Sequence, residues 1–303
     1  VVPDSAVATP AVEGGIVATF RVYLALTKPN IIWLLLITTV PAMVVADRGW
    51  PSTWLVVATL VGGSLAAGGA NALNQFAESD IDARMKRTRN RPLPSGAIAP
   101  RNAAIFGVVL GVLAAVWLVV LVNALAAALA IGALAFYAVV YTLYLKRSTV
   151  QNIVIGGAAG AAPPLIGWAA VTGTVEIESL LLFLVVFYWT PPHFWALSLF
   201  ISDDYAAAGV PMLPVVRGVE ETKRQILLYS FLLVAVTIIF GAAAELRAIY
   251  VAVALAGGAL FIWYAFKLHR GEEIEGARPL FRYSILYLAV LFGAMAADQL
   301  ILG

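Results

Sequence analysis

The sequence contains no cysteine and few charged residues. Without cysteine the chain has no disulfide bonds, thiolate metal sites or cysteine nucleophiles. Only 12% of the 303 residues are charged, whereas a soluble domain of this length carries about a quarter. The net charge of +2 is too small to indicate nucleic acid as a partner. These absences exclude several classes of site and disfavour a soluble domain.

Histidine is scarce too, and several familiar motifs are missing. The two histidines, His193 and His269, are too few to build a multi-histidine metal site by themselves. The sequence has no P-loop, no GxSxG motif and no HExxH motif. Its first residues lack a basic start followed by an apolar core, so we expect no signal peptide. We expect residues 1–17 to form a flexible tail and residues 18–303 to form a single transmembrane domain.

Apolar residues dominate what is present. Hydrophobic residues make up 62% of the chain and its mean hydropathy is +0.93. The apolar runs of about 20 residues are long enough to cross a bilayer. This pattern predicts an all-α fold, a polytopic membrane helix bundle with nine transmembrane helices; eight spans is the competing count. The nine spans are expected near residues 25–46, 53–76, 102–121, 124–145, 152–172, 179–200, 225–243, 248–267 and 282–301.

Lysine and arginine set the expected orientation. With nine spans, all but two of the 19 Lys and Arg residues fall on the side that holds the N-terminus. The two exceptions are Arg48 and Arg247. By the positive-inside rule the basic side is cytoplasmic and the C-terminus lies outside. The basic side also has the longer loops, so we expect the function at the cytoplasmic face.

An unusual concentration of charge follows the second expected span, in the stretch "NALNQFAESDIDARMKRTRNRPLPSG". Asn74, Glu78 and Asp82 are spaced four apart, so on a helix they drift by only about 40° per step and share one face. Asn71 lies near that face, whereas Asp80 lies away from it. Carboxylate and amide oxygens suit Mg²⁺, which commonly bridges to substrate phosphates. The alternative is a solvated helix end whose carboxylates pair with nearby cations.

Cations surround this acidic face. Arg87 and Arg91 lie one turn apart if the helix continues that far, and Pro92 would then end it. Such cations would help to neutralise a diphosphate leaving group. The alternative is the positive-inside rule, which explains the number of cations but not the adjacent carboxylates. Lys146 and Arg147, in the next inner loop, either reach the same anion or only anchor the topology.

The sixth expected span carries a histidine and ends in two aspartates. His193 follows a Pro-Pro pair inside an apolar run. It is a candidate proton carrier or axial ligand to haem iron, or it is satisfied by a backbone carbonyl. Asp203 and Asp204 end the span on the cytoplasmic side and are candidates for a second metal site.

The pattern Asn74-x3-Glu78-x3-Asp82 resembles the first acidic motif of the UbiA-type intramembrane prenyltransferases. Within them, the segments "MKRTRNRPL", "TPPHFWAL" and "DYAAAGVPMLPV" are similar to those of the protohaem IX farnesyltransferases. The resemblance covers roughly residues 20–300. It implies a nine-span enzyme that moves a farnesyl group from farnesyl diphosphate to a vinyl group of haem B, giving haem O. The implied ligands of Mg²⁺ and diphosphate are Asn74, Glu78, Asp82, Arg87, Arg91, Lys146, Arg147 and Asp204.

One feature departs from the resemblance. Many relatives carry a second aspartate-rich motif with carboxylates four apart, whereas alanines follow Asp203 and Asp204 here. The second metal site is therefore not expected to form in the usual way. A dry aromatic lining would shield an allylic cation; the candidates are Phe76, Tyr137, Tyr141, Trp168, Phe194 and Trp195.

The resemblance also implies a setting and competing functions. We expect an integral protein of a bacterial inner membrane with its active site on the cytoplasmic side. A haem A synthase is a candidate partner that would receive the product. A prenyltransferase acting on a quinone precursor, chlorophyllide or lipid is the first alternative. A secondary transporter is the second, although its ionisable residues would be expected near mid-membrane.

Overall fold

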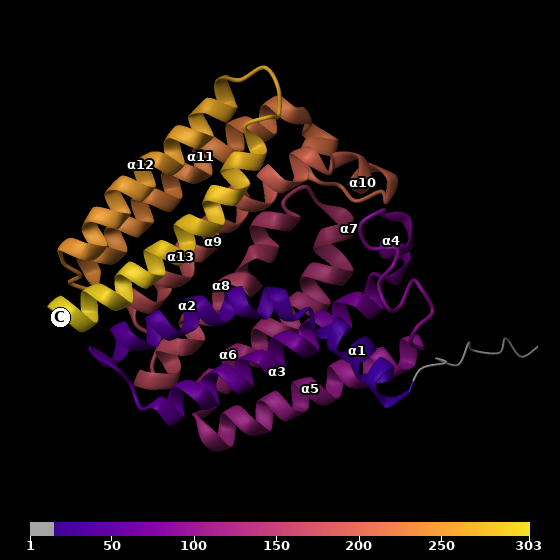
Figure 1. Cartoon of the computed structure of the whole chain (residues 1–303), viewed down its shortest axis with the longest axis horizontal. Coiled ribbons are helices and arrows are strands. Elements are labelled where there is room, and N and C mark those ends of the chain that lie inside the picture. Colours follow the sequence, from indigo (N-terminus) through magenta and orange to yellow (C-terminus); the bar gives the residue numbers. More distant parts are fainter. Residues whose placement is uncertain (1–14) are drawn as a thin grey trace, which may run out of the picture.

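Helices account for the fold, as the apolar runs predict (Figure 1). The computed structural model describes residues 15–303, apart from the side chains at 31 and 33–36. In that part of the chain there is no β-strand. The helices are α1 (Ile16–Thr27), α2 (Pro29–Asp47), α3 (Thr53–Ala77), α4 (Ser79–Arg84), α5 (Pro100–Leu121), α6 (Ala124–Ala135), the π-helix η1 (Phe136–Leu145), α7 (Lys146–Ser148), α8 (Asn152–Thr172), α9 (Ile177–Phe200), α10 (Ser202–Ala207), α11 (Leu213–Ala243), α12 (Ala248–Arg270) and α13 (Ala277–Leu302).

Eight stretches of the described chain are helical, long and apolar enough to cross a membrane. They match the last eight expected spans, and α6, η1 and α7 together form one of them. The first expected span falls mainly on α2, which is not among the eight and includes the side chains outside the described set. The chain is an integral membrane protein, and the count of nine stays a prediction.

The N-terminal boundary differs from the expectation where it can be compared. Residues 1–14 of the expected tail lie outside the described residues. Helix α1 begins at Ile16, inside the range expected to be a tail. A left-handed residue, Lys28 (φ 52°), ends α1, and Pro29 starts α2 at the first helical position, which proline favours. The chain therefore turns sharply at Lys28.

The helices pack in two groups joined in the middle of the molecule (Figure 1). Helices α3, α5 and α6 lie along one side, while α11, α12 and α13 lie along the other. Between them α8 contacts both α2 and α9. Glycine allows a close crossing of α3 and α5, because an added Cβ at Gly69 on α3 would lie 2.8 Å from the Gly107 carbonyl oxygen on α5.

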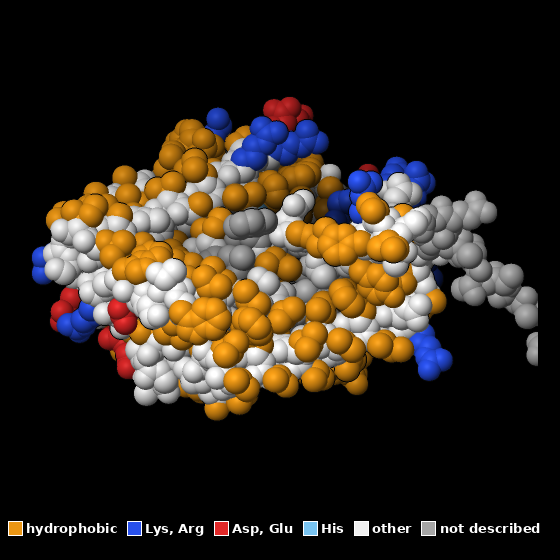
Figure 2. Space-filling view, turned by 60° about the horizontal axis from the view of Figure 1, so that its bottom comes forward, with side chains coloured by type: hydrophobic (Ala, Val, Ile, Leu, Met, Phe, Trp, Pro, Cys, Tyr) orange, Lys and Arg blue, Asp and Glu red, His pale blue; other side chains and the backbone are white. Residues whose placement is uncertain are grey.

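The outer surface is suited to lipid. Large apolar side chains are exposed along the long helices, for example Val120 at 70% and Phe231 at 51%. Figure 2 shows a broad face of apolar side chains, with charged side chains gathered at its ends. An apolar belt of this kind would aggregate in water and is expected of a surface that faces hydrocarbon.

Candidate active site

A cavity of about 470 Å³ opens between α2, α3, η1, α8 and α9. Its charged end contains the acidic side chains Glu78 and Asp82 together with Lys28, Arg91 and Lys146. Its other lining is mostly small or apolar, from residues such as Ala67, Gly157 and Ile166. We call the charged end the mouth and the apolar remainder the chamber. A ligand with a polyanionic head and a hydrocarbon tail matches this division.

The three motif residues share the mouth although the helix between them breaks. Helix α3 ends at Ala77 and α4 begins at Ser79, with Glu78 as the junction. The backbone bonds from Glu78 N to Asn74 O (2.9 Å) and from Asp82 N to Glu78 O (2.8 Å) preserve the four-residue spacing. All three side chains are at most 2% exposed and line the cavity. The predicted common face is therefore present.

Protein cations neutralise the two buried carboxylates. Lys146 Nζ lies 2.6 Å from Glu78 Oε2, and Arg91 Nη1 lies 2.8 Å from both oxygens of Asp82. The second oxygen of Glu78, Oε1, is buried without a hydrogen-bond partner in the described structure. A buried acceptor of this kind is costly unless a cation or a donor reaches it.

The mouth fits a divalent cation that shares its ligands with a substrate. In the described part of the chain, no group of three or more His, Cys, Asp or Glu could hold a metal alone. Glu78 Oε1, together with oxygens of Asp82 and Asn74 in the same cavity lining, would supply only part of a Mg²⁺ shell. Since Mg²⁺ usually completes its shell with water and substrate phosphates, the set suits a metal–diphosphate ligand.

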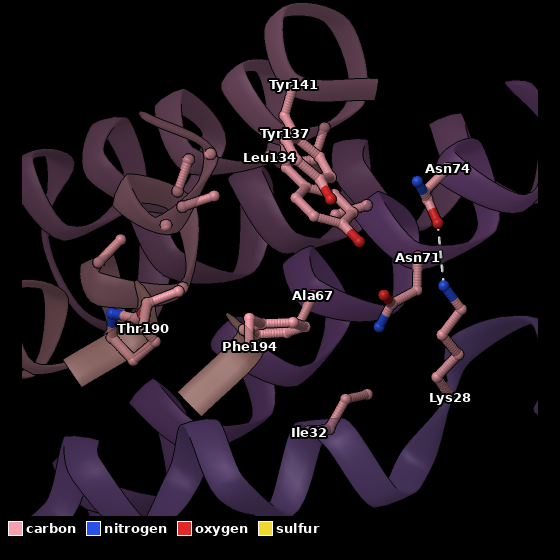
Figure 3. A pocket seen from close by; sticks show the side chains of 18 of the residues that line it. Lys28, Ile32, Ala67, Asn71, Asn74, Leu134, Tyr137, Tyr141, Thr190 and Phe194 are labelled. Carbon is pink, nitrogen blue, oxygen red and sulfur yellow. Dashed lines mark hydrogen bonds between the residues drawn. The ribbon is translucent and has the colours of Figure 1, made fainter. Parts of the chain in front are cut away.

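Lys28 belongs to the mouth, although the sequence analysis included it only in the count of basic residues that sets the orientation. Its Nζ donates to Asn74 Oδ1 at 2.9 Å, as Figure 3 shows. The Asn74 amide donates in turn to Thr142 Oγ1 at 3.0 Å. Asn71 and Gln75 bind the carbonyls that end α1, including Thr27 O at 2.9 Å, and so fix Lys28. The sequence signal that could have located Lys28 is the Lys28-Pro29 pair, which marks a junction between two helices.

Arg87 and Arg91 reach the cavity from a loop and not from a continuing helix. Helix α4 ends at Arg84 because Met85 is extended, well before Pro92. Both arginines nevertheless line the cavity. Tyr205, within the short helix α10, is buried beside them and also lines the cavity, and burial raises the pKa of its hydroxyl. Sequence reasoning missed this tyrosine.

Other expected residues lie outside the cavity lining. Arg147 pairs with Asp80 at 2.7 Å and donates to the Ala77 carbonyl, so it closes the end of α3. The hydrogen bond from Arg147 to Asp80 lowers the pKa of the Asp80 carboxyl. Asp204 accepts from the Arg87 backbone at 3.4 Å and thus supports the mouth from behind. Asp203 is exposed. Direct ligand contacts for Arg147, Asp203 and Asp204 stay predictions.

A π-helix supplies two aromatic rings of the lining. In η1, Tyr137 and Tyr141 stack with ring centroids 5.3 Å apart. Figure 3 shows Tyr137 and Tyr141 of η1 and Phe194 of α9 directed toward the same space. Trp189 also lines the chamber but was not among the expected aromatics. The expected Phe76, Trp168 and Trp195 are not part of the lining.

His193 lies in the chamber wall. Its ring is stacked on Trp189 with centroids 4.3 Å apart and on Phe281 with centroids 4.6 Å apart. Its Nδ1 lies 2.7 Å from Ser284 Oγ. The hydrogen-bond partner of His193 is thus a side-chain hydroxyl and not the backbone carbonyl that the sequence analysis considered.

Comparison with known proteins identifies the family of this chain. The model of the UbiA prenyltransferase family matches residues 35–291, which is most of the chain. The chain belongs to the UbiA prenyltransferase family. As a member, it is a prenyltransferase with a helical membrane fold.

Individual relatives of this UbiA protein are about half identical to it. Protoheme IX farnesyltransferase 1 of Saccharopolyspora erythraea is 53% identical over 280 residues, covering 91% of this chain and 89% of that protein. Protoheme IX farnesyltransferase of Chloroflexus aurantiacus is 51% identical over 281 residues. That match covers 93% of this chain but 48% of the relative, so the chain spans about half its length.

Solved structures share the UbiA fold at low identity. One, described as the digeranylgeranylglyceryl phosphate synthase, has a TM-score of 0.78 at 18% identity, covering 92% of this chain and 98% of that chain. A UbiA homologue from Archaeoglobus fulgidus, bound to GPP and Mg²⁺, has a TM-score of 0.61 at 19% identity, covering 90% of this chain and 99% of that chain. They establish the fold.

Proposed function

We propose that this protein is a protohaem IX farnesyltransferase, which moves farnesyl from farnesyl diphosphate to a vinyl group of haem B. The name is that of relatives such as the Saccharopolyspora erythraea protein, which is 53% identical. The observation that carries the proposal is the cavity, because its acidic and basic mouth meets an apolar chamber that contains His193. The carbon–oxygen bond of the diphosphate breaks, the vinyl carbon bonds to farnesyl, water adds a hydroxyl, and a proton leaves.

The residues of the mouth bind the leaving group. Asn74, Glu78 and Asp82 would hold Mg²⁺, which would neutralise charge on the departing diphosphate. Lys146 and Arg91 are held next to the two carboxylates. In that position their N–H groups can also donate to the diphosphate oxygens. Fixed donors aimed at developing negative charge stabilise the transition state without reorganisation.

The chamber protects the farnesyl cation. Tyr137 and Tyr141 present aromatic rings to the cavity just inside the mouth. Aromatic faces attract a cation, and exclusion of water prevents its premature hydrolysis. No protein nucleophile is needed, because the vinyl carbon of the acceptor attacks.

The proposed setting rests on the distribution of charge and on the relatives. The mouth contains basic residues of the side that holds most of the Lys and Arg residues, which supports an active site on the cytoplasmic side, and the bacterial sources of the relatives support a bacterial inner membrane. Haem O leaves the chamber for an enzyme that oxidises it, and a haem A synthase is the proposed recipient. Ionisable groups gathered at one end of the cavity disfavour a secondary transporter.

A defined turnover assay tests the proposal. Purified protein in lipid nanodiscs receives farnesyl diphosphate with haem B, a quinone precursor or chlorophyllide, each with Mg²⁺ or with EDTA. We expect haem O, identified by mass, with haem B and Mg²⁺ only. Transfer to another acceptor but not to haem B would assign a different UbiA activity. Full turnover in EDTA would refute the metal role.

A further inference from the structure

The contacts around His193 fix more than its position. Trp189 and Phe281 lie nearly parallel to the imidazole, with interplanar angles of 16° and 23°. Two rings this close cannot share one face, so they cover opposite faces of the imidazole. Only the ring edge remains for polar contacts. On that edge Nδ1 meets Ser284, while Nε2 has no hydrogen-bond partner in the described structure and the residue lines the chamber.

Ser284 has a second contact that decides which nitrogen carries the proton. Its Oγ lies 2.7 Å from the Phe281 carbonyl oxygen, one turn back on α13. A carbonyl cannot donate, so the single hydroxyl proton is used in that bond. The remaining contact, 2.7 Å to His193, must then be donated by Nδ1–H to the hydroxyl oxygen. The neutral ring therefore carries its free lone pair on Nε2.

The opposite tautomer is disfavoured by the same contacts. If the hydroxyl donated to Nδ1, it would abandon the Phe281 carbonyl. Nε2–H would then be a donor without a partner beside an apolar chamber, and an unpaired donor costs about 1–3 kcal/mol. The backbone of Ser284 adds rigidity, because its carbonyl accepts from Trp189 Nε1 at 2.8 Å. One residue of α13 thus fixes both the stacked tryptophan and the histidine.

We infer that Ser284 is a positioning residue that keeps the proton of His193 on Nδ1, so that Nε2 offers its lone pair to haem iron. A histidine that ligates a metal usually donates its other N–H to a partner that fixes the tautomer. The inference rests on the proposed haem substrate, and it assigns the acceptor's iron to the wall formed by α9 and α13. Ser284 itself does not touch the substrate.

The first test reads the tautomer without haem. The chain has two histidines, so ¹⁵N-histidine labelling yields two ring systems, and a His269→Gln variant assigns them. We expect a protonated Nδ1 and an unprotonated Nε2 for His193 in the unaltered protein. In Ser284→Ala we expect the two tautomers to mix. A protonated Nε2 in the unaltered protein would overturn the inference, whatever the acceptor is.

The second test reads haem ligation. Ferric haem B is titrated into the protein in nanodiscs, and its absorption and electron paramagnetic resonance spectra are recorded. We expect His193→Ala to lose the imidazole-ligated spectrum, and Ser284→Ala to bind haem about tenfold more weakly. Ser284→Thr, which keeps the hydroxyl, should retain the spectrum. Ser230→Ala is the matched control, since Ser230 is fully buried and bonds only a carbonyl of its own helix.

The outcomes separate this inference from the proposed function. Normal haem farnesylation with an unchanged spectrum in both His193→Ala and Ser284→Ala would leave the function standing and remove the iron ligation. An altered spectrum in His193→Ala with unchanged affinity in Ser284→Ala would remove the positioning role alone. Absence of haem binding and of haem farnesylation would refute the proposed function, while the tautomer would still be measured.

Discussion

At the residue scale, two neighbouring carboxylates have opposite environments and so provide a matched experiment. Glu78 is buried in the mouth with one oxygen unpaired, whereas the Asp80 side chain is 54% exposed and bonded to Arg147. We expect Glu78→Gln to lower the turnover number by about 100-fold or more, because a charged metal ligand is lost. Asp80→Asn should stay within a few-fold of the unaltered enzyme. Steady-state kinetics at saturating Mg²⁺ compare them, and equal losses would contradict the assignment.

Lys28 tests whether the mouth extends beyond the acidic motif. Its ammonium group is held against Asn74 inside the cavity lining. We expect Lys28→Gln to lower kcat/KM for farnesyl diphosphate by about 10- to 100-fold, because one fixed cation no longer meets the leaving group. The control is Lys86→Gln, which removes an exposed lysine outside the lining. If the two variants behave alike, Lys28 serves only the topology.

At the element scale, the crossing of α3 and α5 depends on backbone contact. A methyl group at Gly69 would press on the Gly107 carbonyl and on the Gly111 nitrogen, 3.2 Å away. We expect Gly69→Ala to destabilise the protein by about 1–3 kcal/mol, as overpacking does. Gly132→Ala, on the exposed side of α6 with nothing within 4 Å, should be neutral or stabilising, because alanine favours helix. Thermal unfolding in detergent measures both, and an unaltered melting temperature for Gly69→Ala would disprove the crossing.

Helices were more predictable than the interruptions that shape the site. Apolar runs located the long helices within a few residues at most ends, because hydrocarbon requires an internally bonded backbone. The four-residue spacing also located Asn74, Glu78 and Asp82 on one face. It did not reveal the break at Glu78 or the π-helix at Phe136–Leu145. At both places the chain contacts distant residues, since Glu78 pairs with Lys146 and Thr142 of η1 accepts from Asn74. Local propensity does not contain such contacts.

At the scale of the whole molecule, the mouth is assembled from segments far apart in sequence. Lys28, Glu78, Lys146 and Tyr205 come from four separate regions and line one cavity. The sequence predicted that Glu78 and Lys146 lie at the same membrane face. It did not distinguish the roles of Lys146 and Arg147: Lys146 enters the cavity and pairs with Glu78, whereas Arg147 binds Asp80. Adjacent residues on a helix point about 100° apart, so their roles follow only from the packing of the bundle.

The orientation of the bundle is the remaining expectation at this scale, and the absence of cysteine makes it directly measurable. We expect Ser95→Cys, in the loop beside the mouth, to be protected from a membrane-impermeant maleimide in intact cells and labelled after permeabilisation. Ser52→Cys, at the start of α3, should be labelled in intact cells. Both serines are exposed, and Ser52 makes no capping bond that the change would break. The unaltered chain, which has no thiol, gives the background. The reverse pattern would place the mouth outside, where cytoplasmic farnesyl diphosphate could not reach it.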